Sequence, residues 1–490
     1  MITRRTMLLT SAAVGAVTFA ATLPGMRAAA LAGPPLRRSL KDMDLDDEVL
    51  VTLRSFVTMM NDPARNGQNV SWVGFSNIHG DMSGFNKCPH GNWYFLPWHR
   101  GYVRMYEQAA RALTGNANFA MPYWDWTAQP DFPAAFGDPT FDGQPNPLFL
   151  NGRLMTTGDQ MDPSVTGQAV MDIVYAAQTF EEFGSSRASG QNSTDPMWIT
   201  QGGTQGELEF NPHNNVHCDV RGPFMCSGAS PQDAIFQMHH CNIDRIWAEW
   251  VSQGRSDSSD PMWLNMPFTD NYFAPDGTPY THVVNELLEV EPLGYTYGIT
   301  NPPKPPVYPG RVLYIAALNG APGLLEAVGV ERQVVSLNEV AEPSAPLSVK
   351  LPAINRNLTT LLGSSLVPDL ERAGLGTPTV YAIIRGLEPA EHDGTQLRVF
   401  VNLPDAGPDT PTKDNPNFVT SIGFFGPAGM HEGHDMKKSV AVDLTPAIRR
   451  LIGAGVEVGD DISVRLVPVA QQPGDVPGKV TVGAIELAIV

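Results

Sequence analysis

The stretch that decides the fold is residues 231–251, PQDAIFQMHHCNIDRIWAEWV. Apolar residues and one histidine recur in it at intervals of three or four, the spacing of one helix face: Phe236, His240, Ile243, Trp247 and Val251. Pro231 and Asp233 are typical of a helix start. The pattern therefore predicts a helix over Ala234–Val251.

His240 lies on the apolar, core-facing stripe of this helix, whereas His239 lies about 100° round from it. We therefore expect His240 to be a metal ligand, and His239 to support a ligand from behind or to line the pocket. Asp244 follows one helical turn after His240. There it is placed either to hydrogen-bond a ligand or to form a buried ion pair with an arginine.

A second helix is predicted over Trp98–Leu113, because apolar and aromatic residues follow His99 at helical spacing. Pro97 stands immediately before it, near a position that helix starts tolerate. His99 begins the buried side of this helix. His90 precedes it by nine residues, and His79 comes from an earlier loop or helix end.

Two further histidines, His213 and His217, are four residues apart, which on a helix places both rings on one face about 5–6 Å apart. The candidate ligands then form two groups of three: His79, His90 and His99, and His213, His217 and His240. The alternative is that each is a core histidine bonded to backbone carbonyls. That explanation suits any one of them, but it fits poorly for two groups that each end on an amphipathic helix.

Copper is the metal that this donor set favours. Six neutral imidazoles without a carboxylate or thiolate suit copper, although imidazole also binds zinc, iron and nickel. Structural zinc prefers cysteine, and di-iron bundles are rich in glutamate with a Glu-x-x-His pattern. Neither pattern is found here. An all-histidine binuclear site stabilises Cu(I) and can share dioxygen between two ions.

Composition limits the kind of protein. The chain has 490 residues, enough for two or three domains at roughly 150 residues each. Lys and Arg number 32 against 51 Asp and Glu, and the net charge of −19 argues strongly against nucleic-acid binding, which needs clustered cations. Four cysteines in a chain of this length exclude a disulfide-framework protein.

The first 32 residues have the pattern of an export signal. Arg4 and Arg5 stand directly before an apolar stretch that runs to about Leu23, which is short for a membrane span of about 20 residues. Small residues around Ala30 offer cleavage sites. We predict a twin-arginine signal peptide over residues 1–32 and a periplasmic or secreted protein, against the alternative of an uncleaved anchor. No later segment has about 18 uninterrupted apolar residues, so we expect no membrane association after the signal is removed.

The rest of the chain divides into three parts. Residues 33–300 mix helical periodicity with long polar loops, and a proline-rich linker and connector over residues 301–340 begins with NPPKPP. Residues 341–490 carry short β-rich runs bounded by turn residues, which predicts a second, mostly β domain. The predicted strands are Val380–Arg385, Gln396–Asn402, Phe418–Phe425, Ser439–Leu444, Ile462–Val467 and Val480–Val490.

Five motifs in order make the chain resemble the type-3 copper proteins, specifically tyrosinases and polyphenol oxidases. They are residues 88–90 (CPH), 95–100 (FLPWHR), 122–126 (PYWDW), 212–217 (PHNNVH) and 236–250 (FQMHHCNIDRIWAEW). Residues 260–265 (DPMWLN) and the tail look like plant-type polyphenol oxidases, so the resemblance covers nearly the whole mature chain. It implies an exported bacterial form with a mainly α copper domain, a four-helix bundle around a binuclear site with long loops, and then a mostly β C-terminal domain.

The resemblance assigns two copper ions to the six histidines, with dioxygen as co-substrate. Copper A would be held by His79, His90 and His99, and copper B by His213, His217 and His240. In relatives with a Cys-x-His pattern the cysteine forms a thioether with the second copper A histidine, as Cys88 and His90 would; the alternative is a free or structural cysteine. Cys218 and Cys226 could bridge a short loop, which the sequence leaves open, and Cys241 is expected to be a buried thiol.

The reaction implied by the resemblance is o-hydroxylation of monophenols and oxidation of o-diphenols to o-quinones. Hydroxylation needs a base, because a phenol with a pKa near ~10 is mostly protonated at neutral pH. Asn214, which follows the first copper B histidine, and Glu209 are expected to orient a water for this step, with Glu207 in reserve. The small side chains of Ser227–Ala229 leave room for monophenols as well as catechols.

The β domain is expected to pack on the copper domain and to shield its site. The residues considered for this are Phe424, Phe425 and Met430, although ordinary packing is the simpler explanation for any one of them. The rival functions are a catechol or o-aminophenol oxidase without monophenol hydroxylation, and a hemocyanin-like dioxygen carrier. The expected partners are small phenols, and the sequence leaves the oligomeric state and the preferred phenol open.

Overall fold

The computed structural model describes a helical region and a sheet-rich region. The described residues are 33–188, 190–203, 205–299, 331–352, 359, 380–389, 395–425, 438–459, 461–470 and 476–489. The predicted signal peptide, most of the predicted connector and Met430 lie outside them. Within the described ranges, the structure contains no helix that combines the length and the apolar character needed to cross a membrane.

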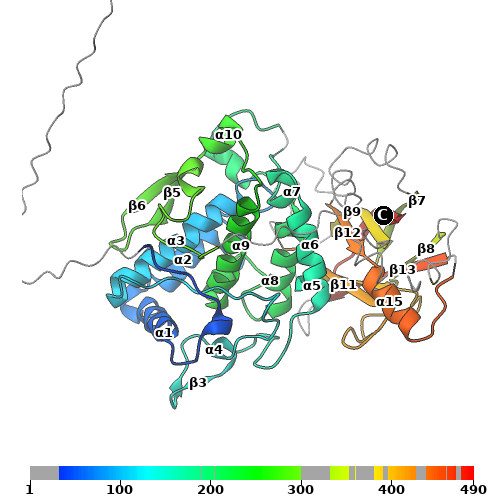
Figure 1. Cartoon of the computed structure of the whole chain (residues 1–490), viewed down its shortest axis with the longest axis horizontal. Coiled ribbons are helices and arrows are strands. Elements are labelled where there is room, and N and C mark those ends of the chain that lie inside the picture. Colours follow the sequence, from blue (N-terminus) through cyan, green and yellow to red (C-terminus); the bar gives the residue numbers. More distant parts are fainter. Residues whose placement is uncertain are drawn as a thin grey trace, which may run out of the picture. The chain divides into compact units, whose positions relative to one another are not determined.

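The region before residue 300 consists of helices joined by long loops, coloured blue to green in Figure 1. Its α-helices are α1 (Glu48–Met60), α2 (Trp72–His79), α3 (Phe95–Thr114), α4 (Ala134–Gly137), α5 (Pro163–Thr166), α6 (Gln168–Ala176), α7 (Phe180–Phe183), α8 (Asn214–Val220), α9 (Ile235–Ser252) and α10 (Pro261–Leu264). Short 3-10 helices are Leu40–Asp42, Pro63–Arg65, Pro196–Thr200, Ser230–Gln232 and Val284–Leu287, and a π-helical turn is Glu209–His213. Antiparallel hairpins pair β1 (Gly80–Asp81) with β2 (Gly84–Phe85), β3 (Thr140–Phe141) with β4 (Gln144–Pro145), and β5 (Pro267–Phe273) with β6 (Pro279–Val283).

Both helices predicted from periodicity are present. The helix predicted over Ala234–Val251 is α9, shifted by one residue at each end. The other predicted helix, α3, begins at Phe95 rather than at Trp98, so the expectation that Pro97 precedes the helix is wrong. Proline is tolerated in the first turn because the N–H that it lacks would have no partner within the helix. At the other end, Gly115 adopts φ 74°, the left-handed conformation common just after helices.

A buried charge network joins α3, α9 and the start of the described chain. Arg37 donates from Nε to Glu107 Oε2 of α3 at 2.9 Å, and from Nη1 to Asp244 Oδ2 of α9 at 3.1 Å. Arg100 donates to the other Asp244 oxygen at 2.5 Å, and the Tyr297 hydroxyl donates to Oδ2 at 2.6 Å. Of the two roles considered for Asp244, the structure shows the buried ion pair.

The described residues after 330 form two four-stranded antiparallel sheets, coloured yellow to red in Figure 1. One sheet has the order β11 (Phe418–Gly423), β10 (Thr395–Val401), β13 (Asp461–Ala470) and β8 (Leu347–Pro352). The other has the order β12 (Lys438–Asp443), β9 (Val380–Pro389), β14 (Val480–Ile489) and β7 (Glu331–Ala341). Buried side chains from both sheets and from helix α15 (Thr445–Gly453) share one hydrophobic core, as in a β-sandwich.

All six predicted strands are present, with ends within a few residues of the prediction. The strands β7 and β8 and the helix α15 were not predicted. β7 begins at Glu331, inside the range expected to be connector, so the sheet region starts earlier than the prediction. Among the described strands it pairs with β14 alone, and an edge strand needs no long apolar run that a sequence pattern would reveal.

Polar contacts join the sheet β11-β10-β13-β8 to the helix α8. Gly423 N donates to Asn215 Oδ1 at 2.8 Å. Gln396 accepts from Arg221 Nη2 at 3.1 Å and donates to Asp219 Oδ1 at 3.2 Å. The end of β11 therefore lies against α8, the helix that carries one of the predicted ligands.

Candidate metal centre

Two groups of buried side chains in the helical region could each hold a metal ion. They are His79, Cys88, His90 and His99, and His213, His217, His239 and His240. Within each group, the possible ligand atoms lie within 4.8 Å of one another. The structure therefore brings together all six histidines expected as ligands, in the two expected groups of three.

The first group is assembled from two helices and the chain between them. His79 is the last residue of α2, whose first turn is capped by the Ser71 hydroxyl, which accepts from Gly74 N at 3.0 Å. His99 lies near the start of α3, and His90 lies in the segment between β2 and α3. The helices fix two of the rings, and the segment that leads into α3 supplies the third.

The second group also comes from helices, with one departure from the prediction. His213 ends the π-helical turn, whereas His217 lies in α8, so the pair does not share one α-helix. Pro212 inside the π-helical turn has no N–H to donate, and such turns often mark functional sites. The two rings nevertheless lie close together in an edge-to-face arrangement, with centroids 4.6 Å apart.

The two groups are neighbours. The rings of His99 and His240 stack across the boundary, with centroids 4.3 Å apart and an interplanar angle of 13°. His90 and His213 also approach each other, with centroids 5.7 Å apart. The arrangement fits two metal ions side by side.

Hydrogen bonds at Nδ1 indicate which nitrogen carries the proton in five of the six rings. Backbone carbonyls accept from Nδ1 of three of them: His79 (Gly228 O, 2.7 Å), His99 (Phe95 O, 2.8 Å) and His217 (Met225 O, 2.7 Å). Side-chain oxygens accept from Nδ1 of two more: His90 (Glu209 Oε1, 3.3 Å) and His213 (Asn214 Oδ1, 3.0 Å). In a neutral ring whose proton sits on Nδ1, Nε2 keeps its lone pair and can bind a metal.

Two of these Nε2 atoms lack the partners that buried polar atoms normally have. Nε2 of His79 and Nε2 of His213 are buried without a hydrogen bond. Nε2 of His217 lies 3.1 Å from Nε2 of His240, a distance that suits two ligands of one ion. Buried acceptors that face one another are costly unless something satisfies them, and a metal ion would do so. The residues present fit a metal pair bound by neutral imidazoles.

The hydrogen bond from Trp126 distinguishes His239 from His240 as a possible ligand. The indole N–H of Trp126 donates to His239 Nδ1 at 3.0 Å, so this nitrogen is an acceptor. The proton of the neutral His239 ring then sits on Nε2, which blocks that nitrogen from binding a metal. His240 makes no such bond, and its Nε2 faces His217. The geometry favours His240 as the ligand.

Burial favours the neutral form of five of the six proposed ligand rings. Desolvation lowers the pKa of His79 to about 4 and the pKa of His213 to about 3. The same cause holds the pKa values of His99, His217 and His240 well below the ordinary histidine value. Metal ligands must be deprotonated, so the interior already supplies the protonation state that a metal needs.

Cys88 lies between two rings of the first group. Its Sγ is 3.2 Å from Nε2 of His90 and 3.2 Å from Nε2 of His99. Burial, and then the charge of Glu209, raise the pKa of this thiol well above its ordinary value. Cys88 is therefore a neutral thiol in contact with both rings, and its position suits a bond to either one.

Gln205 joins the side chains of Glu209 and Asn214, and the backbone N–H of Asn214 also donates to the Glu209 carbonyl. Glu209 Oε1 accepts from Gly91 N at 2.7 Å and from Gln205 Nε2 at 3.3 Å. The other oxygen, Oε2, accepts from the Ser185 hydroxyl. Asn214 Nδ2 in turn donates to Gln205 Oε1 at 3.1 Å. Sequence reasoning missed Gln205 and Ser185, because neither belongs to a motif and both come from loops.

Comparison with known proteins supplies the family. The family model for the common central domain of tyrosinase matches residues 69–163 and 135–253, which include both histidine groups. The tyrosinase of Streptomyces glaucescens is 32% identical over 215 residues, which cover 40% of this chain and 77% of that protein. The chain belongs to the tyrosinase family.

Other relatives extend over most of the chain. Tyrosinase HcTyr1 of Hahella sp. is 27% identical over 447 residues, 83% of this chain and 84% of that protein. Polyphenol oxidase C of Solanum lycopersicum is 26% identical over 485 residues, 91% of this chain and 72% of that protein.

Solved structures show the same fold. A latent aurone synthase, a polyphenol oxidase, superposes with a TM-score of 0.55 at 19% identity, covering 94% of this chain and 90% of that one. The pro-tyrosinase of Aspergillus oryzae gives a TM-score of 0.54 at 16% identity, covering 94% and 93%. The shared fold includes both the helical and the sheet-rich region.

Family and geometry together identify a binuclear copper centre. The chain is a tyrosinase-type copper oxidoreductase that acts on phenolic substrates. This confirms the enzyme class and the fold class predicted from the sequence.

In this tyrosinase-family centre, Phe425 covers the histidines from the sheet-rich side. Its ring stacks on His217, with centroids 4.1 Å apart and an interplanar angle of 10°. It also meets His90 edge-on at 5.1 Å and His213 at 5.6 Å. Phe424 is instead buried in the core of the sheets. Of the two, only Phe425 reaches both histidine groups.

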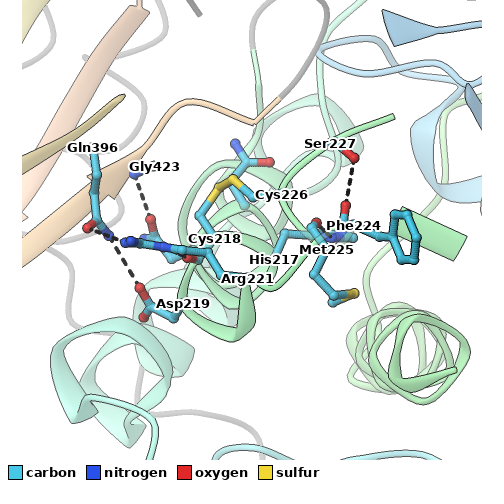
Figure 2. The surroundings of a disulfide bond; sticks show 12 residues. His217, Cys218, Asp219, Arg221, Phe224, Met225, Cys226, Ser227, Gln396 and Gly423 are labelled. Carbon is cyan, nitrogen blue, oxygen red and sulfur yellow. Dashed lines mark hydrogen bonds between the residues drawn. A yellow bond between two sulfur atoms is a disulfide. The ribbon is translucent and has the colours of Figure 1, made fainter. Parts of the chain in front are cut away.

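A disulfide lies directly beside the second group. Cys218 and Cys226 are bonded, with Cα atoms 4.7 Å apart (Figure 2). Cys88 and Cys241 are free, buried thiols. The pairing that the sequence left open is therefore present, and Cys241 is the buried thiol expected of it.

Proposed function

We propose that the six histidines hold two copper ions and that the enzyme hydroxylates monophenols at the ortho position and oxidises o-diphenols to o-quinones. The ligands of copper A would be His79, His90 and His99, and those of copper B His213, His217 and His240. The observation that carries this assignment is the set of Nδ1 hydrogen bonds that leave Nε2 atoms facing one another. Dioxygen would be the co-substrate.

When bound, the copper pair supplies the redox chemistry with dioxygen; the chain's own residues hold geometry and exclude water. Three carbonyls, one carboxylate and one amide oxygen orient the rings from behind, which limits their rotation. Cys88 would restrict a ring further through a thioether, and we retain His90 as its partner because the two residues form the Cys-x-His pattern. The 3.2 Å contact supports a bond to His99 equally well.

Glu209 and Asn214 are the residues that we assign to the phenol proton. Both lie next to proposed ligands: Glu209 accepts from His90 and Asn214 accepts from His213. A water held between them could take the proton of an entering monophenol. Gln205 now spans that gap, with a donor toward Glu209 and an acceptor toward Asn214.

Gln205 favours a second candidate function, an o-diphenol oxidase with little monophenol hydroxylation. A water in the gap would donate to Glu209 and accept from Asn214, and the Gln205 amide already makes both bonds. If the amide keeps the water out, catechols would still react because they need no separate proton acceptor before oxidation. The small side chains of Ser227–Ala229 would then limit neither class of substrate.

We also propose that Phe425 shields the centre in the intact chain. A phenol that approached copper B would occupy the space above the His217 ring, where Phe425 stacks. Phe424 supports this position from the core of the sheets. Met430, the third residue considered, lies outside the described residues.

Export by the twin-arginine route to the periplasm or the medium remains our proposal for location. The paired arginines support it, and so does the disulfide, because such bonds persist in oxidising compartments. Mass determination of protein secreted by the native host would show whether residues 1–32 are removed.

A steady-state panel of monophenols and o-diphenols, with bound copper quantified in each preparation, tests the function. We expect two copper ions per chain, quinone formation from o-diphenols, and slower hydroxylation of monophenols after a lag. Oxidation of o-diphenols alone would select the second candidate. Reversible dioxygen binding without quinone formation would indicate a dioxygen carrier.

A further inference from the structure

The disulfide closes the chain directly beside a proposed copper ligand. Cys218 follows His217 in α8, and its partner Cys226 follows Met225 (Figure 2). The Met225 carbonyl accepts the hydrogen bond from His217 Nδ1 at 2.7 Å. The ligand and the carbonyl that orients it are thus each one residue away from a bonded cysteine. The disulfide therefore limits the distance between the His217 ring and the Met225 carbonyl, because each is one residue away from a bonded cysteine.

The same segment serves the other histidine group. Two residues after Cys226, the carbonyl of Gly228 accepts from His79 Nδ1 at 2.7 Å. Gly228 packs so closely on the hairpin β1–β2 that a β-carbon would collide with the backbone of Gly84 and Asp81. This second carbonyl is therefore also held by a backbone contact outside the disulfide.

The chain between the cysteines is held in an uncommon shape. Arg221 has φ 49° and Gly222 has φ 77°, both left-handed, so the chain reverses abruptly after α8. The left-handed region is sparsely populated by residues with a β-carbon. Arg221 Nε donates to the Cys218 carbonyl at 2.6 Å, which holds the turn together with the disulfide. The Met225 side chain is buried, so opening the bond would loosen this loop without unfolding it.

We propose that the Cys218–Cys226 bond is a copper lock. When the bond is closed, the Met225 carbonyl holds the His217 ring in its metal-binding orientation. When the bond is open, the loop moves, the ring rotates, and copper leaves or enters more easily. This inference rests on the proposed ligand assignment and extends it to the control of copper retention.

The redox step involves only these two cysteines. Closing the bond joins the two sulfur atoms and releases two protons and two electrons, which reduce the disulfide of an oxidised thiol–disulfide carrier protein to two thiols. Opening is the reverse reaction. The other two cysteines of the chain, Cys88 and Cys241, are buried thiols whose pKa values burial raises, which makes them poor reactants.

Copper release tests the lock. Copper-loaded native protein and the double variant Cys218→Ser/Cys226→Ser are mixed with an excess of a copper chelator, and retained copper is measured over time. We expect release of at least one ion to be about ten to a hundred times faster in the variant, the usual effect of losing support behind a ligand. A phosphine reductant should speed release from the native protein and change nothing in the double variant.

The outcomes separate the lock from the function. Equal release rates from native, reduced and variant proteins, each shown by circular dichroism to be folded, would overturn the lock. Acceleration by reductant in the double variant as well would also overturn it, because the effect would then come from elsewhere. If monophenol hydroxylation fails while the copper-release rates differ as expected, the hydroxylase proposal falls and the lock stands. Absence of tightly held copper from the oxidised native chain would overturn both proposals.

Discussion

Single hydrogen bonds decide which nitrogen atoms face the copper ions. In our proposed assignment, the carbonyl behind Nδ1 of His217 leaves its Nε2 open to a metal, whereas the indole N–H behind Nδ1 of His239 places the proton of that ring on Nε2. His239 and His240 are adjacent, equally buried and chemically identical, so only their neighbours distinguish them. They form a matched pair for mutagenesis.

We expect His240→Ala to lower the copper content from two ions per chain to about one, because it removes one of three ligands. His239→Ala should keep two ions, since that ring's Nδ1 accepts from Trp126 and its Nε2 carries the proton. Elemental analysis of the purified variants measures the difference. A His239 variant that loses copper while the His240 variant keeps it would reverse the assignment.

Gln205→Ala should raise the ratio of monophenol to o-diphenol turnover by roughly tenfold, within the ~10²–10⁴ that a positioned proton acceptor contributes. The shorter side chain admits water between Glu209 and Asn214. Gln205→Met is the control, because it fills the same space without hydrogen bonds and should leave the ratio low. Equal ratios in the Ala variant and the native enzyme would contradict the role of Gln205.

Among the elements, the segment before α1 contributes more to the stability of the fold than its lack of regular structure indicates. Arg37 is only 1% exposed and contacts charged groups on both α3 and α9. Breaking a buried ion pair leaves an uncompensated charge, which typically costs about 3–5 kcal/mol. The neighbouring Arg38 is partly exposed and pairs only with Asp47 at 2.7 Å.

Arg37→Ala should lower the free energy of unfolding by about 3 kcal/mol, at the low end of that range because Asp244 keeps Arg100 and Glu107 keeps Arg111. Arg38→Ala, the matched control, should cost about 0–1 kcal/mol. Urea denaturation of both variants measures the two values. Similar losses for the two arginines would show that the network does not stabilise the core.

The sequence predicts the helices better than the contacts between them. Periodicity placed α9 within a residue at each end, because a face of large apolar side chains repeats every turn. It placed the start of α3 at Trp98 instead of Phe95, since proline is allowed at several first-turn positions and Pro97 lies inside the helix. The strand β7 was missed because it lies at the edge of its sheet among the described strands, where no long apolar run is required.

The same limit applies to the site. The histidines could be grouped because spacing and helix phase are local properties. Gln205, Ser185 and the carbonyls of Met225 and Gly228 could not be predicted, because their roles depend on loops meeting in space. Phe425 was one of three equal candidates until the stacking on His217 distinguished it.

At the scale of the whole molecule, Phe425 of the sheet-rich region stacks on His217 of the helical region. Phe425→Ala should raise kcat/KM for o-diphenols by roughly threefold to tenfold. Substrate would bind the native protein only in the fraction of molecules whose site is open, and the variant would remove this limit. Phe424→Ala is the control: it removes a core side chain without uncovering His217. Steady-state kinetics at low substrate measures the effect, and equal kcat/KM for native and Phe425→Ala proteins would remove the shield.

The metal-free protein should lose stability as the pH falls below about 6.5. Burial lowers the pKa of His79 to about 4 and the pKa of His213 to about 3, against about 6.5 in the unfolded chain. Between pH 6.5 and about 4 the unfolded chain binds protons that the folded chain refuses, so the free energy of unfolding decreases there and is unaffected above.

Each fully shifted histidine contributes up to about 1.4 kcal/mol per pH unit in that window. Burial raises the pKa of Glu207 to about 7 and the pKa of Asp219 to about 6, so these two carboxyl groups increase the free energy of unfolding as the pH falls. Six histidines with lowered pKa values have the opposite effect and outnumber them. Urea denaturation of metal-free protein at pH 7.5, 6.5 and 5.5 tests this, and a flat profile from 6.5 to 5.5 would contradict it.

The Arg37 network also constrains the order of events during synthesis. Arg37 leaves the ribosome early, whereas its partner Asp244 follows 207 residues later and Tyr297 follows 260 residues later. At about 5–20 residues per second, the nascent chain waits roughly 10 to 50 s before the last of these groups emerges. The helical region therefore completes its core only after all six proposed ligand histidines have been translated, and we expect copper to meet all of its ligands together.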